Sequence, residues 1–142
     1  FANVIGPGLT HGVIYDLIHK LTNNSQELKV LGNGHQTKPY IYIDDLLKAV
    51  DWVVTHSNET VNLFNIGVDS TISVREIVKL IIEKMKLKRV KVLYDKTPNG
   101  WVGDVPTFNI SISKLKKLGF KPRYTSREGI AKTIDIRLSE LS

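Results

Sequence analysis

The sequence of 142 residues has no cysteine, which excludes disulfide bonds, a thiol nucleophile and thiolate ligands for a metal. It also has no run of eighteen apolar residues, so no membrane span is predicted. No secretory signal precedes the first motifs, and we expect a cytoplasmic protein. The only methionine is Met85, and Phe1 opens a segment that resembles a strand already under way. We therefore expect the chain to be a piece of a longer protein.

The charge balance is basic, with 20 Lys and Arg against 14 Asp and Glu and a net charge of +6. Nucleic acid, an anionic surface or a phosphorylated small ligand could each use such a balance. The densest basic run, residues 84–91, has no interleaved aromatic residues, and no zinc-finger spacing accompanies it. We interpret most of this charge as solvated helix faces and do not expect nucleic acid as a partner.

Hydrophobic periodicity predicts a mixed α/β fold of about four short strands and five helices in a single domain. The expected strands include residues 28–31, 39–43 and 61–66, and the first helix is expected from Thr10 to Asn23. Two capping boxes, 73–76 and 125–128, predict the starts of two further helices. Asp44 or Asp45 is expected to cap the helix that follows the second of these strands.

The residues alone form no catalytic constellation. Residues 32–34 (GNG) lack a third glycine and lie between two expected strands, so no helix follows them to receive a pyrophosphate. The sequence contains no Tyr-x-x-x-Lys, and its four histidines have no spacing typical of metal ligands. Composition and spacing therefore indicate an α/β binding domain without a metal.

Five segments match a further pattern when they are taken in order. They are residues 1–8 (FANVIGPG), 31–45 (LGNGHQTKPYIYIDD), 64–67 (FNIG), 103–106 (GDVP) and 112–122 (ISKLKKLGFKP). Together they resemble the C-terminal half of extended short-chain dehydrogenase/reductases that act on nucleotide sugars. Residues 10–14 (THGVI) and 100–104 (GWVGD) are most similar to UDP-glucose 4-epimerase-type proteins of archaea.

The resemblance implies that residues 1–142 are one nucleotide-sugar-binding domain. It also implies that the NAD-binding Rossmann domain, with its Tyr-x-x-x-Lys, is absent from this chain. The chain would then be inert alone and bind no cofactor itself, with a UDP-sugar and the Rossmann half as its partners. We also expect self-association through the exposed interface. A 4,6-dehydratase, another epimerase and a non-catalytic binding module remain alternatives.

The resemblance assigns three groups to the sugar and the diphosphate. Asn3 would hydrogen-bond the sugar or the diphosphate. The helix start at Gly12, Val13 and Ile14 would direct backbone N–H groups toward the phosphates, where the helix dipole favours negative charge. Lys38 stands where the family has a phosphate-binding arginine, and a lysine lacks the bidentate fork of that arginine.

Three further residues are assigned to the nucleoside. Lys29 and Leu31 would border the base, and Asp104 would contact ribose hydroxyls or order its own loop. Relatives often carry a second arginine just before the Gly-Asp pair, but this sequence has residues 99–102 (NGWV) there, with Lys96 as the nearest cation. This departure argues against a tight diphosphate clamp.

Overall fold

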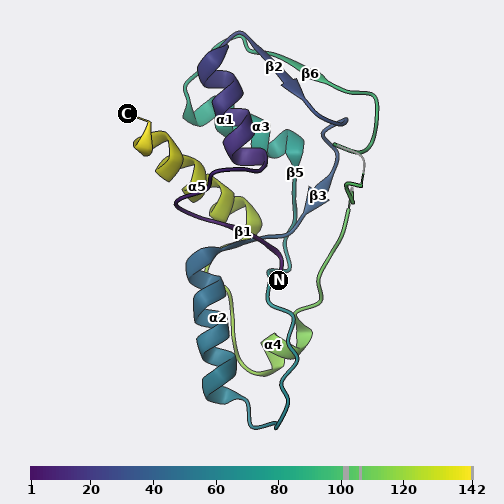
Figure 1. The fold of residues 1–142 in the computed structure, drawn as a ribbon, viewed down its shortest axis with the longest axis vertical. Helices are drawn as coiled ribbons and strands as arrows, with labels where there is room; N and C mark the ends of the chain where they lie inside the picture. The colour runs from purple at the N-terminus through teal and green to yellow at the C-terminus, as the bar shows by residue number, and fades with distance from the viewer. Residues whose placement is uncertain (101–102, 106, 142) are drawn as a thin grey trace.

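A computed structural model of the chain describes residues 1–100, 103–105 and 107–141. Over these ranges it has five helices and six short strands (Figure 1), which confirms the predicted mixed α/β class. The helices are α1 (Val13–Asn23), α2 (Ile43–His56), α3 (Val74–Lys84), α4 (Ser113–Lys117) and α5 (Ser126–Glu140). The strands are β1 (Asn3–Ile5), β2 (Glu27–Val30), β3 (Thr37–Lys38), β4 (Tyr40–Tyr42), β5 (Ile72–Ser73) and β6 (Lys91–Tyr94).

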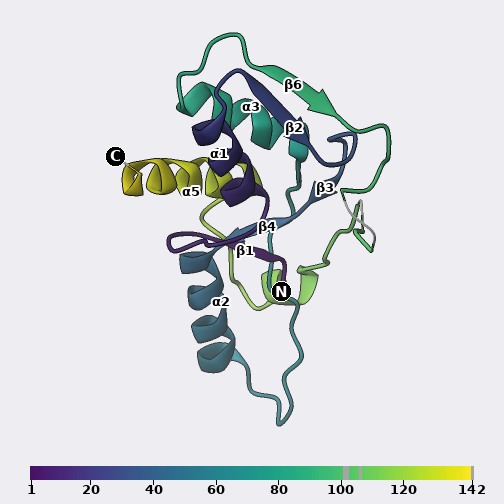
Figure 2. The same ribbon diagram turned by 45° about the horizontal axis from the view of Figure 1, so that its top comes forward.

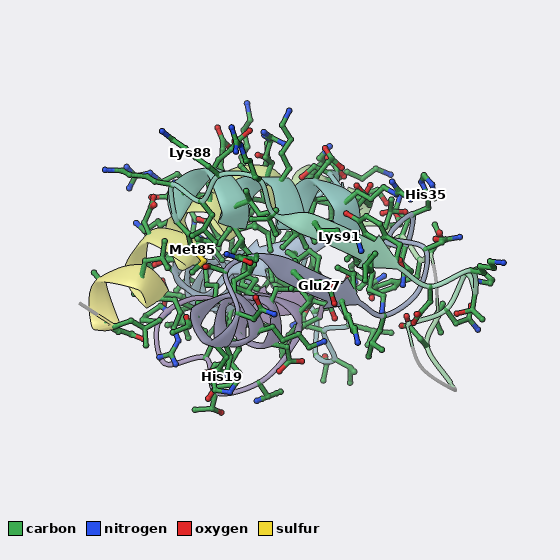
Figure 3. The ribbon with its side chains drawn as sticks, turned by 90° about the horizontal axis from the view of Figure 1, so that it is seen from above. His19, Glu27, His35, Met85, Lys88 and Lys91 are labelled. Carbon is green, nitrogen blue, oxygen red and sulfur yellow. The ribbon has the colours of Figure 1, made fainter. Side chains whose placement is uncertain are left out.

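The strands pair in three separate two-stranded sheets. β1 pairs with β4 and β2 with β6, both in parallel, whereas β3 and β5 are antiparallel. Parallel partners need a long crossover, and helices supply much of it here. Glu27 and Lys91 are register partners on β2 and β6, and their charged atoms lie 3.9 Å apart (Figure 3).

The larger core forms where α1, α3 and α5 pack together beside β2 and β6 (Figure 1). The apolar residues of α3 recur at helical spacing, so Ile77, Leu80 and Ile81 all face inward. Ile18 on α1 and Ile130 on α5 complete the contact and are almost fully buried. This core holds the elements that surround the cavity described below.

A smaller core lies between α2, α4 and the β1–β4 pair. Its buried residues include Ile41, Leu46 and Leu115. Successive residues of β4 serve different cores, since Tyr40 joins the larger and Ile41 the smaller, as alternation along a strand requires. α2 extends away from the α1–α3–α5 group (Figures 1 and 2).

Two local predictions are wrong at the level of elements. Residues 61–66 form no strand, although the Ala2 N–H donates to the Ile66 carbonyl over 2.9 Å. Val61 and Leu63 are 80% and 82% exposed, and no strand of the described residues pairs with this segment. The first helix begins at Val13 rather than Thr10.

Neither Asp44 nor Asp45 caps α2, whose N-cap is Tyr42 with no side-chain cap. The helix begins at Ile43, so Asp45 lies inside its first turn, and its carboxylate is buried. It accepts hydrogen bonds from the backbone N–H groups of Arg123 and Tyr124 over 3.0 and 2.9 Å. Asp45 therefore fixes the segment that leads into α5. Both predicted capping boxes are confirmed, at Ser73 and Thr125.

Within the described ranges, no helix is long and apolar enough to cross a membrane.

Candidate functional site

A cavity of about 540 Å³ opens between β1, the N-terminus of α1 and the end of β2. This volume is within the range of small-molecule sites. The loop that contains Gly100 and the start of α3 at Val74 complete its wall. Seven of the eight residues predicted from the sequence line this one cavity: Asn3, Gly12, Val13, Ile14, Leu31, Lys38 and Asp104.

The N-terminus of α1 offers unused backbone donors to the cavity. Gly12 is the N-cap with φ of 89°, a conformation that glycine adopts without strain, and its missing side chain supplies no cap. The first bond of the helix runs from Asp16 N–H to the Gly12 carbonyl over 2.9 Å. The N–H groups of Val13 and Ile14 therefore have no acceptor among the described residues. With the helix dipole, this end favours an anion.

Lys38 and Asp104 form an ion pair with each other inside the cavity. The Asp104 side chain is only 6% exposed and also accepts from the Gly100 N–H over 3.1 Å. The family resemblance assigned both residues to one ligand, whereas in the structure they contact each other. An anionic ligand must therefore compete with Asp104 for Lys38.

Tyr40 adds a neutral hydroxyl to the cavity wall. Its side chain is buried, and this burial, together with the negative charge of Asp104, raises the pKa of Tyr40 to about 12. The hydroxyl therefore stays protonated near neutral pH and can both donate and accept.

Of the two predicted residues on and just after β2, Leu31 lines the cavity and Lys29 does not. Leu28 and Val30 are buried, so the alternation along the strand points Lys29 outward. The structure does not bring Lys29 into the cavity lining. Leu31, just beyond the strand, lines the cavity with 59% of its surface exposed. It gives the site an exposed apolar contact.

Asn3 lies half-buried on β1. Its backbone N–H donates to the Pro39 carbonyl over 3.3 Å, and no described residue hydrogen-bonds its side-chain amide. The amide is thus available to a ligand. Trp101, Val102 and Pro106, which belong to motifs used in the sequence analysis, lie outside the described residues.

Gln36 is a lining residue that the sequence analysis did not select. It is 4% exposed, and its Nε2 donates to the Leu31 carbonyl over 3.3 Å. Its Oε1 is buried and has no donor among the described residues. The residue lies within the matched segment 31–45, so its motif position was visible, but its unpaired oxygen depends on packing.

The glycine turn at residues 32–34 does not have the surroundings of a dinucleotide-binding turn. The turn at residues 32–34 leads into β3, not into a helix, and Asn33 Oδ1 accepts from the His35 N–H over 2.9 Å. No helix N-terminus is therefore aligned with this turn as a dinucleotide site requires. His19 and His35 lie well apart (Figure 3), and the described part of the chain has no cluster of three potential metal ligands.

Comparisons with known proteins agree with this architecture. Residues 1–67 match the NAD dependent epimerase/dehydratase family. A Methanocaldococcus jannaschii protein named "Putative UDP-glucose 4-epimerase" is 31% identical over 139 residues, covering 95% of this chain and 43% of that protein. A Dictyostelium discoideum dTDP-D-glucose 4,6-dehydratase is 27% identical over 162 residues, which cover 92% of this chain and 37% of that protein. A crystal structure of UDP-galactose 4-epimerase superposes with a TM-score of 0.84 at 32% identity. The superposition covers 99% of this chain and 44% of that structure.

The fold is that of one part of the extended short-chain dehydrogenase/reductases, as the motifs indicated. The chain is homologous to the NAD dependent epimerase/dehydratase family, and its relatives are epimerases and dehydratases of nucleotide sugars. It spans less than half the length of these relatives.

Proposed function

We propose that this chain is the nucleotide-sugar-binding domain of an NAD-dependent 4-epimerase of the UDP-glucose/UDP-galactose type. The observation that supports this proposal best is that seven residues predicted from the motifs line one cavity, which has both apolar and charged groups in its wall. The α1 N-terminus and Lys38 supply positive potential for a diphosphate. Leu31 offers an apolar face to a base, and Asp104 offers acceptors to ribose hydroxyls.

The Lys38–Asp104 pair gives this proposal a specific binding step. Without ligand, the two charges neutralise each other in a site where Asp104 is almost fully enclosed. A diphosphate draws Lys38 onto a phosphate oxygen and leaves Asp104 free for the ribose. The exchange replaces one ion pair with two charge-assisted contacts, one at the diphosphate and one at the ribose.

The hydride chemistry would belong to a Rossmann half that holds NAD. Residues 1–142 contain no Tyr-x-x-x-Lys. α2 presents Leu47, Val50 and Val54 to solvent, and we assign this stripe to the contact with that half. Alone, the chain would bind ligand, be catalytically inert and self-associate through the stripe.

The Dictyostelium relative keeps a 4,6-dehydratase as a second candidate. The two activities would share this domain and differ in residues beside the catalytic tyrosine. Incubating the parent protein and NAD with UDP-glucose and, separately, with dTDP-glucose distinguishes them, because an epimerase forms the galactose epimer and a dehydratase forms a 4-keto-6-deoxy sugar. No product in either incubation would favour a non-catalytic binding module.

Calorimetric titration of the chain with UDP and UDP-glucose at low salt tests the binding proposal. We expect both to bind, and Lys38→Ala to weaken binding by about 10- to 100-fold, the usual worth of a charge-assisted contact. Lys88→Ala is the matched control, because Lys88 carries the same charge on an exposed position that does not line the cavity (Figure 3). Absence of binding at millimolar nucleotide would overturn the proposal.

A further inference from the structure

The unpaired Oε1 of Gln36 is the most unusual polar atom in the cavity wall. A buried acceptor without a donor is rare in folded proteins, since its lost hydration is not replaced. The orientation of the amide is fixed by the Leu31 carbonyl, which must face Nε2 rather than Oε1. Oε1 therefore remains the acceptor that a ligand can satisfy.

The place of Gln36 in the cavity identifies the part of the ligand that would reach it. Its amide is bonded to Leu31, whose side chain offers the apolar face for a base. A Cβ placed on Gly100 would lie 3.4 Å from Gln36 Nε2 and 3.3 Å from Asp104 Oδ2. Gln36 is thus close to the residue assigned to the ribose, and the base lies next to the ribose in any nucleotide.

We propose that Gln36 selects the base by accepting a hydrogen bond from a ring N–H that lies beside a carbonyl. This inference rests on the proposed nucleotide-binding function. Uracil and thymine carry such a donor at N3, and guanine carries one at N1. Cytosine and adenine present an unprotonated ring nitrogen at the same place, which would face Oε1 acceptor to acceptor. The site therefore favours imide or lactam bases.

The same residues provide the route by which the base reaches Gln36. Gly32 and Gly100 both lie against the amide, and a Cβ on Gly32 would approach Nε2 to 2.1 Å. The Gly100 N–H is held by Asp104, whose other partner is Lys38. When a diphosphate draws Lys38 away, Asp104 turns to the ribose and releases Gly100. Release of Gly100 removes its contact with the Gln36 amide as the base arrives.

Titration of the unaltered chain with UDP, CDP and 3-methyl-UDP tests the inference without any substitution. The three ligands share the ribose and diphosphate, and only UDP has the N3–H. We expect UDP to bind about 10- to 100-fold more tightly than either of the others, as for a site built around one buried hydrogen bond. Equal affinities for UDP and CDP would overturn the inference while leaving nucleotide binding intact.

Gln36→Met assigns the preference to this side chain, because methionine has a similar volume and no amide. We expect the affinities of the variant for UDP and CDP to differ by no more than about threefold. A thermal unfolding transition shows that the variant is folded. A folded variant that keeps the full preference would also overturn the inference. Failure of all three nucleotides to bind the unaltered chain is a different result, since it refutes the proposed function itself.

Discussion

Two helices of this chain, α3 and α2, are both amphipathic but are covered very differently. α3 packs against α1, α5 and β5, and its apolar residues Ile77 and Ile81 are fully buried. α2 buries Leu46 and Ala49 on one side, yet Leu47 and Val54 on another side are 61% and 75% exposed.

The spacing of the exposed residues explains this contrast. Leu47, Val50 and Val54 are three and four residues apart, so they form one continuous stripe along α2. A helix that is apolar on two sides is typical of an element packed between two layers, and the described residues cover only one side of α2. The larger core is complete within the chain and carries most of the cavity, whereas the smaller core is open on the α2 side.

The largest expected effect tests this difference directly. Ile81→Ala in the larger core should lower the free energy of unfolding by about 2–5 kcal/mol, because it removes buried methylenes and leaves a cavity. Leu47→Ala removes a similar side chain from the α2 stripe and should change it by less than about 0.5 kcal/mol. Urea unfolding followed by circular dichroism, at concentrations where the chain is monomeric, measures both. A loss at Leu47 equal to that at Ile81 under these conditions would show that Leu47 is buried within the monomer.

The sequence predicted the helices well because their periodicity and capping boxes are local signals. The start at Ser73 and the inward face of α3 follow from residues a few positions apart. The strand expected at residues 61–66 is wrong because a strand needs a pairing neighbour, and none of the described residues provides one there. Asp45 was misassigned for the same reason, since its partners are 78 and 79 residues away.

The candidate site shows the same limit. Ordered motifs selected seven residues that the fold brings into one cavity. They could not reveal that Lys38 and Asp104, 66 residues apart, pair with each other. The direction of the Lys29 side chain depends on which residues of β2 face inward, which the motifs do not give. The unpaired Oε1 of Gln36 could be recognised only once the position of every neighbouring donor was known.

Tyr40 lies on β4, which contributes to both cores, and its titration should show whether this region is buried from solvent. Its pKa rises from 10.0 to about 12 in the folded chain, with burial as the main cause. Between these values the unfolded chain has lost the proton that the folded chain keeps. Stability is therefore fully present below pH 10 and falls as the pH rises toward 12, by about 2–3 kcal/mol for this group.

Comparison with Tyr40→Phe isolates this contribution, since phenylalanine keeps the ring but cannot ionise. Urea unfolding from pH 9 to 12 should show a steeper fall for the unaltered chain than for the variant. Tyr94, whose pKa is also raised by burial, titrates in both proteins and cancels in the difference. Parallel pH profiles would mean that Tyr40 is solvated and that the junction between the cores is open.

The smallest expected change in stability belongs to the α2 stripe, where the effect should appear in association instead. The double variant Leu47→Lys, Val54→Lys places charges on the exposed stripe and should alter the free energy of unfolding by less than about 0.5 kcal/mol per site. Burial of an apolar side chain of this size in an interface contributes about 1.5–3 kcal/mol. Sedimentation equilibrium should therefore show self-association of the chain weakened by at least about tenfold.

Asn58→Lys, Thr60→Lys is the matched control, because it adds the same two charges on exposed residues beyond the end of α2 and leaves the stripe unchanged. If both double variants weaken association equally, net charge alone governs it and the stripe is not the contact. If the unaltered chain sediments as a monomer at every concentration, the stripe does not drive association at all. Loss of association in the stripe variant alone would identify α2 as the uncovered side of the domain, and a Rossmann half added in trans should then compete for the same residues.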